Sequence, residues 1–135
     1  MSLSARVAAL ATRVGAELSI IGEQTILTND AAFTRAAGVG WLGGARIMRS
    51  RRAVTLVLSV QEFNGWGEGS RYLVGTVPDG FKPAIAAVGA ATFHNGAASY
   101  IPTVAEIGVD GRVHVHTGTA PRLVALLITI EYITT

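Results

Sequence analysis

The chain has 135 residues and a formal net charge of +2, and 50% of its residues are hydrophobic while 15% are charged. This composition excludes a disordered chain, and the small net charge argues against a nucleic-acid partner. The sequence has no cysteine, which excludes disulfides and thiolate sites, and no apolar stretch is long enough for membrane insertion. The apolar surplus indicates that some surface is buried between copies of the chain.

Residues 1–21 are expected to form an N-terminal coiled-coil helix, whose start Ser2 or Ser4 can cap. Apolar residues recur there at alternating steps of four and three, with one more a heptad later, which is the a/d pattern of a coiled coil. They are Leu3, Val7, Leu10, Val14 and Ile21. We expect this stripe to hold a homotrimer together. The alternative is an ordinary amphipathic helix that packs on its own domain.

Residues 22–40 lose this pattern. They are rich in threonine, asparagine and aspartate, which favour turns and caps, and Gly38 and Gly40 precede Trp41. We interpret this segment as a neck or linker, with a helical turn through residues 31–37.

Residues 41–135 change to a period of two, which is typical of half-buried strands. Asp110-Gly111 lies between two such stretches and predicts a tight hairpin. The sequence predicts an all-β head, arranged as an antiparallel β-sandwich of seven or eight strands. The alternation is clearest in two sets: Val54, Leu56, Leu58 and Val60, and Val124, Leu126, Ile128, Ile130 and Tyr132.

Two motifs in the second half carry a family resemblance. Residues 77–83 read V-P-D-G-F-K-P, in which Pro78 fixes φ, Gly80 can supply a positive φ and Phe81 can fold back into the core. Residues 109–115 read V-D-G-R-V-H-V. This order resembles the C-terminal head domains of phage tail fibres, receptor-binding proteins and minor tail proteins, especially those of phages of actinobacteria. The resemblance implies a trimeric, jelly-roll-like head in the virion tail, with adhesion as its task and the N-terminal helix as its attachment to other tail proteins.

The glycine-rich stretch 63–72 is the candidate ligand-binding loop. Trp66 can stack on the apolar face of a sugar, while Asn64, Glu68 and Arg71 can bind its hydroxyl groups. The alternative is that Trp66 is buried over the end of the strand domain.

Other chemistry has weaker support in the sequence. The motifs of nucleophilic hydrolases, P-loop proteins and zinc proteases do not occur, so we expect neither catalysis nor a cofactor. His114 and His116 lie two residues apart on one strand and therefore share a face. They are weak candidates for a metal, and the alternative is an ordinary polar outer face.

The sequence therefore predicts a phage tail protein, part of a fibre, tip or baseplate, that binds glycan on the host surface through a trimeric β head. Two alternatives stay open. One is a purely structural virion protein, such as a capsid decoration or head fibre, without a receptor. The other is a bacterial trimeric lectin or C1q-like module.

Overall fold

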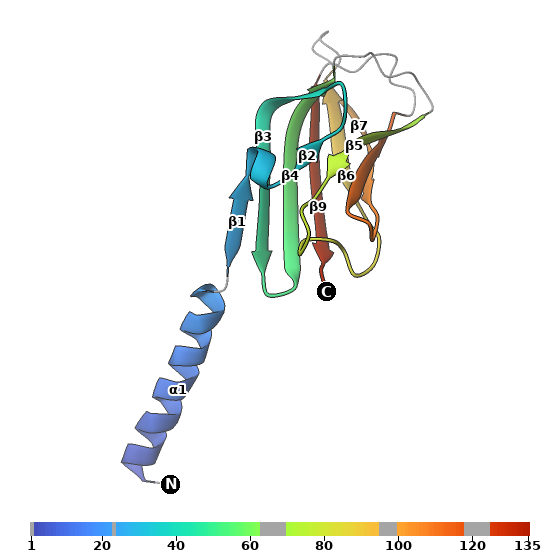
Figure 1. The fold of residues 1–135 in the computed structure, drawn as a ribbon. Coiled ribbons are helices and arrows are strands. Elements are labelled where there is room, and N and C mark those ends of the chain that lie inside the picture. The colour runs from blue at the N-terminus through green and yellow to red at the C-terminus, as the bar shows by residue number, and fades with distance from the viewer. Residues whose placement is uncertain (1, 23, 63–69, 95–99, 118–124) are drawn as a thin grey trace.

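A computed structural model of the chain describes residues 2–22, 24–62, 70–94, 100–117 and 125–135 (Figure 1). Within these ranges one α-helix is followed by nine strands, and the strand pairs are all antiparallel. The elements are α1 (Leu3–Gly22), β1 (Thr25–Thr28), the 3-10 turn η1 (Asn29–Ala31), β2 (Thr34–Arg35), β3 (Val39–Ser50), β4 (Ala53–Glu62), β5 (Arg71–Thr76), β6 (Ala87–His94), β7 (Tyr100–Ile107), β8 (Arg112–His116) and β9 (Ala125–Ile133).

A helix is present where one is predicted, and Figure 1 shows α1 lying apart from the strands. Its assembly as a coiled coil stays a prediction. Ser2 caps it, because its Oγ accepts a hydrogen bond of 3.2 Å from the backbone N–H of Ala5. Four residues of the predicted stripe are exposed, by 48% to 77%: Leu3, Val7, Leu10 and Val14. The side chain of Ile21 lies outside what the structure describes. Within the described residues, no helix combines the length and apolarity needed to cross a membrane.

The predicted all-β domain is also confirmed. The alternating residues of β4 and β9 point into one core, where Leu56, Leu58, Ile128 and Ile130 are completely buried. The two strands are neighbours, with Leu58 opposite Ile128, so their buried side chains pack directly against each other.

The strands form one hydrogen-bonded sheet, in the order β1-β3-β4-β9-β6-β7-β8-β5-β2, rather than the two separate sheets expected of a sandwich. Laid flat, nine strands would measure about 38 Å across, since neighbours lie about 4.8 Å apart. The edge strands β1 and β2 are nevertheless joined by residues 29–33 alone, a link that reaches about 20 Å at most. The sheet must therefore curl until its edges approach, and the core fills its concave side.

The interpretation of residues 22–40 as a neck is wrong from residue 25 onward. β1 pairs with β3, and β2 pairs with β5. Ala32 and Phe33 are completely buried in the core. A β-carbon on Gly75 would overlap the Phe33 ring, so the glycine makes room for it. The strand domain thus begins at β1, because the turn-forming residues of this segment form η1 and place Phe33 between the two sheet edges.

Both predicted turns have the expected backbone. Gly80 has φ +87° and Gly111 has φ +83°, a conformation that costs glycine little. Phe81 is buried, its carbonyl oxygen accepts a hydrogen bond of 2.6 Å from the Tyr132 hydroxyl, and the Arg49 guanidinium lies 5.2 Å from its ring. The 77–83 turn is therefore held against both β3 and β9.

Candidate functional site

An open pocket lies at one end of the sheet. At this end β4, β6 and β8 finish and β5, β7 and β9 begin, as the strand registers require (Figure 1). We call it the loop end. Loops on a rigid scaffold are common places for binding residues, so side chains fixed by the strands here are the first candidates for a site.

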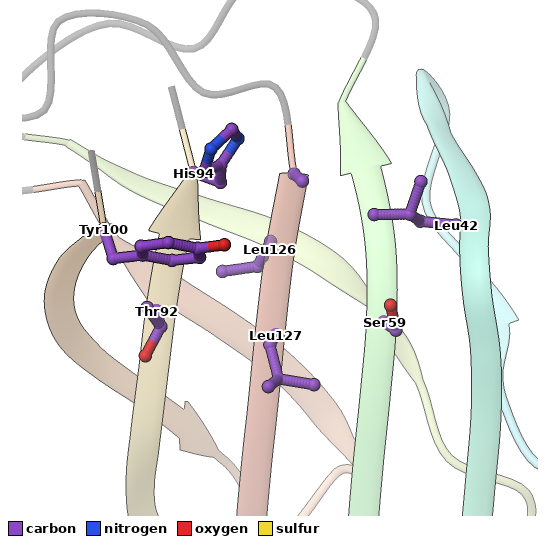
Figure 2. Close-up of a pocket in the computed structure, with 8 residues that line it drawn as sticks. Leu42, Ser59, Thr92, His94, Tyr100, Leu126 and Leu127 are labelled. Carbon is purple, nitrogen blue, oxygen red and sulfur yellow. The ribbon is translucent and has the colours of Figure 1, made fainter. Parts of the chain in front are cut away.

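An open pocket of about 370 Å³ lies on the outer face of the sheet at the loop end. Five strands supply its lining, so that its shape depends on the sheet rather than on one loop (Figure 2). The lining residues are Leu42, Ser59, Thr92, His94, Tyr100, Ala125, Leu126 and Leu127. Among them there is no aspartate, glutamate, lysine or arginine.

An aromatic pair forms one side of the pocket. His94 ends β6 and Tyr100 begins β7, and these two residues face each other in the strand register. Their ring centroids lie 4.9 Å apart, with the rings tilted by 53°. Figure 2 shows the Tyr100 ring reaching across β6 towards Leu126 on β9. Because Tyr100 is 73% exposed, most of its ring remains available to a ligand.

A β-bulge forms the opposite side. The register of β3 against β4 shifts between Trp41 and Gly44, and bulges of this kind redirect side chains at sheet rims. The Ser59 Oγ accepts a hydrogen bond of 3.1 Å from the backbone N–H of Gly43. This contact fixes the bulge that presents Leu42, which is 57% exposed, to the pocket.

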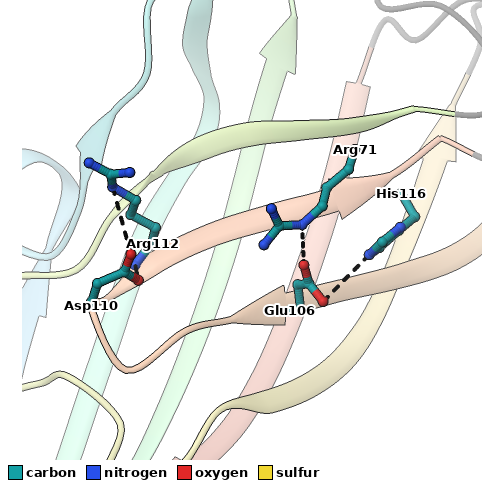
Figure 3. A network of polar contacts seen from close by, with 5 residues as sticks. All are labelled: Arg71, Glu106, Asp110, Arg112 and His116. Atoms are coloured by element: carbon teal, nitrogen blue, oxygen red, sulfur yellow. Dashed lines mark hydrogen bonds and ion pairs between the residues drawn. The ribbon is translucent and has the colours of Figure 1, made fainter.

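A cluster of charged and polar side chains lies on the neighbouring strands β5, β7 and β8 (Figure 3). The Arg71 Nε donates to Glu106 Oε1, and His116 Nε2 lies 3.5 Å from Glu106 Oε2. The hydrogen bond from Arg71 holds the pKa of Glu106 below its usual value. Arg71 and Glu106 also line a smaller cavity of about 190 Å³, where their opposite charges compensate each other.

His114 lies on the same outer face, opposite Leu73 and Glu106. Its Nδ1 atom is buried and has no hydrogen-bond partner in the described part of the chain. Burial, with a smaller contribution from the charge of Arg71, lowers the pKa of His114. The folded protein therefore favours the neutral imidazole.

This lowered pKa predicts a loss of stability in mild acid. The unfolded chain takes up the His114 proton near pH 6.5, above the pKa of the folded protein, so stability falls as the pH drops through that value. We expect the free energy of unfolding, measured with urea, to be lower at pH 5.5 than at pH 7.5. His114→Gln should remove most of this difference. Glu106→Gln should keep or enlarge it, because the Glu106 carboxylate raises the pKa of His114 against the effect of burial, and the pKa of Glu106 itself is lowered. An equal pH dependence in His114→Gln would contradict the assignment.

The predicted site residues are only partly placed. Arg71 begins β5 and is paired with Glu106, while Trp66, Asn64 and Glu68 lie outside the described residues. His114 and His116 share the outer face of β8 as predicted, and no group of three metal-binding side chains occurs among the described residues. Sequence reasoning missed Glu106 as a partner of His116. Counting outward from Asp110-Gly111 as a two-residue turn would have placed Glu106 opposite Val115, whereas the loop has three residues, 109–111, and Glu106 lies opposite His114.

Comparison with known proteins gives a match at the level of structure. No protein-family model and no curated sequence matches the chain. The head domain of lactococcal phage bIL170, a structure discussed for the common fold of receptor-binding domains of lactococcal phages, is similar in structure, with a TM-score of 0.66 and 16% sequence identity. The match covers 82% of this chain and 100% of that domain. This chain has the fold of a phage head domain. The resemblance that the 77–83 and 109–115 motifs predict is confirmed at the level of fold, and the pocket lies at the loop end of that head fold.

Proposed function

We propose that the protein is a receptor-binding component of a phage tail and that it binds carbohydrate on the host surface. The observation that carries this proposal is the open, uncharged pocket with an exposed aromatic ring on a head-domain fold. Saccharide sites combine an aromatic face with a few polar groups, and Tyr100, Ser59 and Thr92 supply this combination. The test is binding of the labelled full chain to isolated host cell walls and to a glycan array. Failure to bind either would favour the purely structural alternative.

We also propose that three copies assemble through α1, which attaches the head to other tail proteins. The exposed stripe of α1 supports this, since four large apolar side chains on one helix need a partner surface. Three sites on one trimer, and many trimers on one particle, would raise weak binding by avidity without new contacts.

The site binds sugar without cleaving it. A glycosidase needs a carboxyl group whose pKa is raised, so that it can act as a general acid. The described lining of the pocket contains no carboxyl group. Glu106 lines the smaller cavity, and its pKa is lowered by Arg71. Cell-wall glycan incubated with the protein is expected to keep its chain length on chromatography.

The loop 63–69 extends this proposal, with Trp66 stacking on a sugar and Asn64, Glu68 and Arg71 as its polar partners. Replacing Trp66 with alanine is expected to abolish adsorption of the protein to host cells while the melting temperature stays nearly unchanged. Val109→Ala is the control, since Val109 is 60% exposed and lies in the β7–β8 turn, away from the loop end. A Trp66→Ala protein that melts much earlier would show that Trp66 belongs to the core.

A further inference from the structure

The pocket at the loop end also indicates which class of sugar the protein recognises, an inference that rests on the proposed function. We propose that this pocket holds one neutral pyranose unit of the receptor glycan. The apolar face of the sugar stacks on Tyr100, and Ser59 and Thr92 bind its hydroxyl groups. The following geometry supports each part of this assignment.

The hydroxyl groups are spaced for a single ring. Leu127 lies opposite Ser59 on β4 and opposite Thr92 on β6, so the two hydroxyl-bearing strands are separated by β9 alone. Strands two positions apart lie about 9–10 Å from each other. A pyranose over Leu127, with a hydrogen bond of about 2.8 Å at each end, can bridge this distance. The Ser59 hydroxyl accepts from Gly43 and still has a proton to donate to a sugar oxygen.

The apolar surfaces are placed for the ring carbons. Tyr100 offers an exposed ring on one side of the pocket, and Leu42 and Leu127, which are 57% and 52% exposed, offer aliphatic surface towards the other. The volume of about 370 Å³ is at the lower end of the range for small-molecule sites, about 300–1,000 Å³. It therefore suits a single sugar unit better than a longer stretch of polysaccharide.

The absence of charge from the described lining sets the class of sugar. A carboxylate or phosphate placed among Leu42, Leu127 and Tyr100 would lose water without gaining an ionic partner, which is costly. Arg71 is paired with Glu106 and lines the other cavity. The described lining therefore favours a neutral hexose over a uronic acid or a sugar phosphate.

The proposal can be tested by saturation-transfer NMR on the full chain. The probes are the methyl glycosides of glucose, galactose and mannose, and those of the three corresponding hexuronic acids. We expect at least one neutral glycoside to bind with a Kd of about a millimolar, and its uronic acid about tenfold more weakly or worse. Tyr100→Ala should abolish this binding, whereas Tyr100→Phe, which keeps the ring, should retain it.

Several results would overturn the proposal: no binding of any neutral glycoside, equal binding of the uronic acid, or unchanged binding by Tyr100→Ala. A change in oligomeric mass on Tyr100→Ala, measured by light scattering, would also overturn it, because the ring would then be a subunit contact. Binding of the wild-type chain to host cell walls is measured in parallel. Wall binding without sugar binding would overturn this proposal and leave the receptor-binding function intact, whereas the loss of both would overturn both.

Discussion

Replacing Phe33 with alanine is expected to lower the free energy of unfolding by about 3–5 kcal/mol, the usual cost of removing a buried phenylalanine. Phe33 is completely buried, packs over Gly75 and lies 6.4 Å from the Trp41 ring, centroid to centroid. It also belongs to the short link between the two sheet edges. Its loss would therefore leave a cavity where the curled sheet comes together.

The measurement is urea denaturation at a fixed protein concentration, because assembly would add its own stabilisation. Ile85→Ala is the matched control, since Ile85 is 79% exposed and its loss should change stability by less than about 0.5 kcal/mol. If Phe33→Ala costs no more than this control, residues 29–33 do not belong to the core, and the neck interpretation would be restored.

Placing aspartate at both Val7 and Leu10 is expected to convert the proposed trimer into monomers. Both side chains lie on the exposed stripe of α1, where an assembled coiled coil would bury three copies of each. Six carboxylates in an apolar seam would be costly to desolvate and would repel one another. Light scattering should show the mass falling from three times the 14.0 kDa of one chain to a single chain.

Ala5→Asp with Ala8→Asp is the matched control, because these positions have the same spacing on another face of the same exposed helix. This variant should keep the mass of the wild-type protein. The strand domain should stay folded in both variants, since α1 lies apart from it (Figure 1). A monomeric wild-type protein, or a trimer that survives Val7→Asp with Leu10→Asp, would show that α1 does not hold the assembly.

The parts of the fold that sequence analysis predicts are the locally encoded ones. The alternation of Leu56 and Leu58 predicts β4, because successive side chains point to opposite faces of a strand. Gly80 and Gly111 predict turns, because only a few residue types tolerate a positive φ. Each of these signals depends on a short stretch of chain.

The parts that sequence analysis misses depend on distant pairing. β2 has two residues and pairs with β5, which begins some 35 positions later, so no local pattern identifies it. The pocket has the same property, since its lining comes from five strands that are brought together by the sheet order. One local clue was present: Asn95-Gly96 predicts a turn directly after His94. It does not identify Tyr100 as the partner, because five residues separate the two in the pairing that forms.

The two outermost strands have a consequence for behaviour in concentrated solution. β1 and β2 have only four and two residues, so little unpaired backbone is offered to a strand from another molecule. Directly after β1, the Asn29 side chain accepts a hydrogen bond of 3.3 Å from the backbone N–H of Ala45 on β3. The other edge strand, β2, carries the charged Arg35. Short, covered or charged edges oppose the strand-to-strand joining that leads to fibrils. A chain that is half hydrophobic is thereby protected from amyloid-like aggregation where many copies are crowded together.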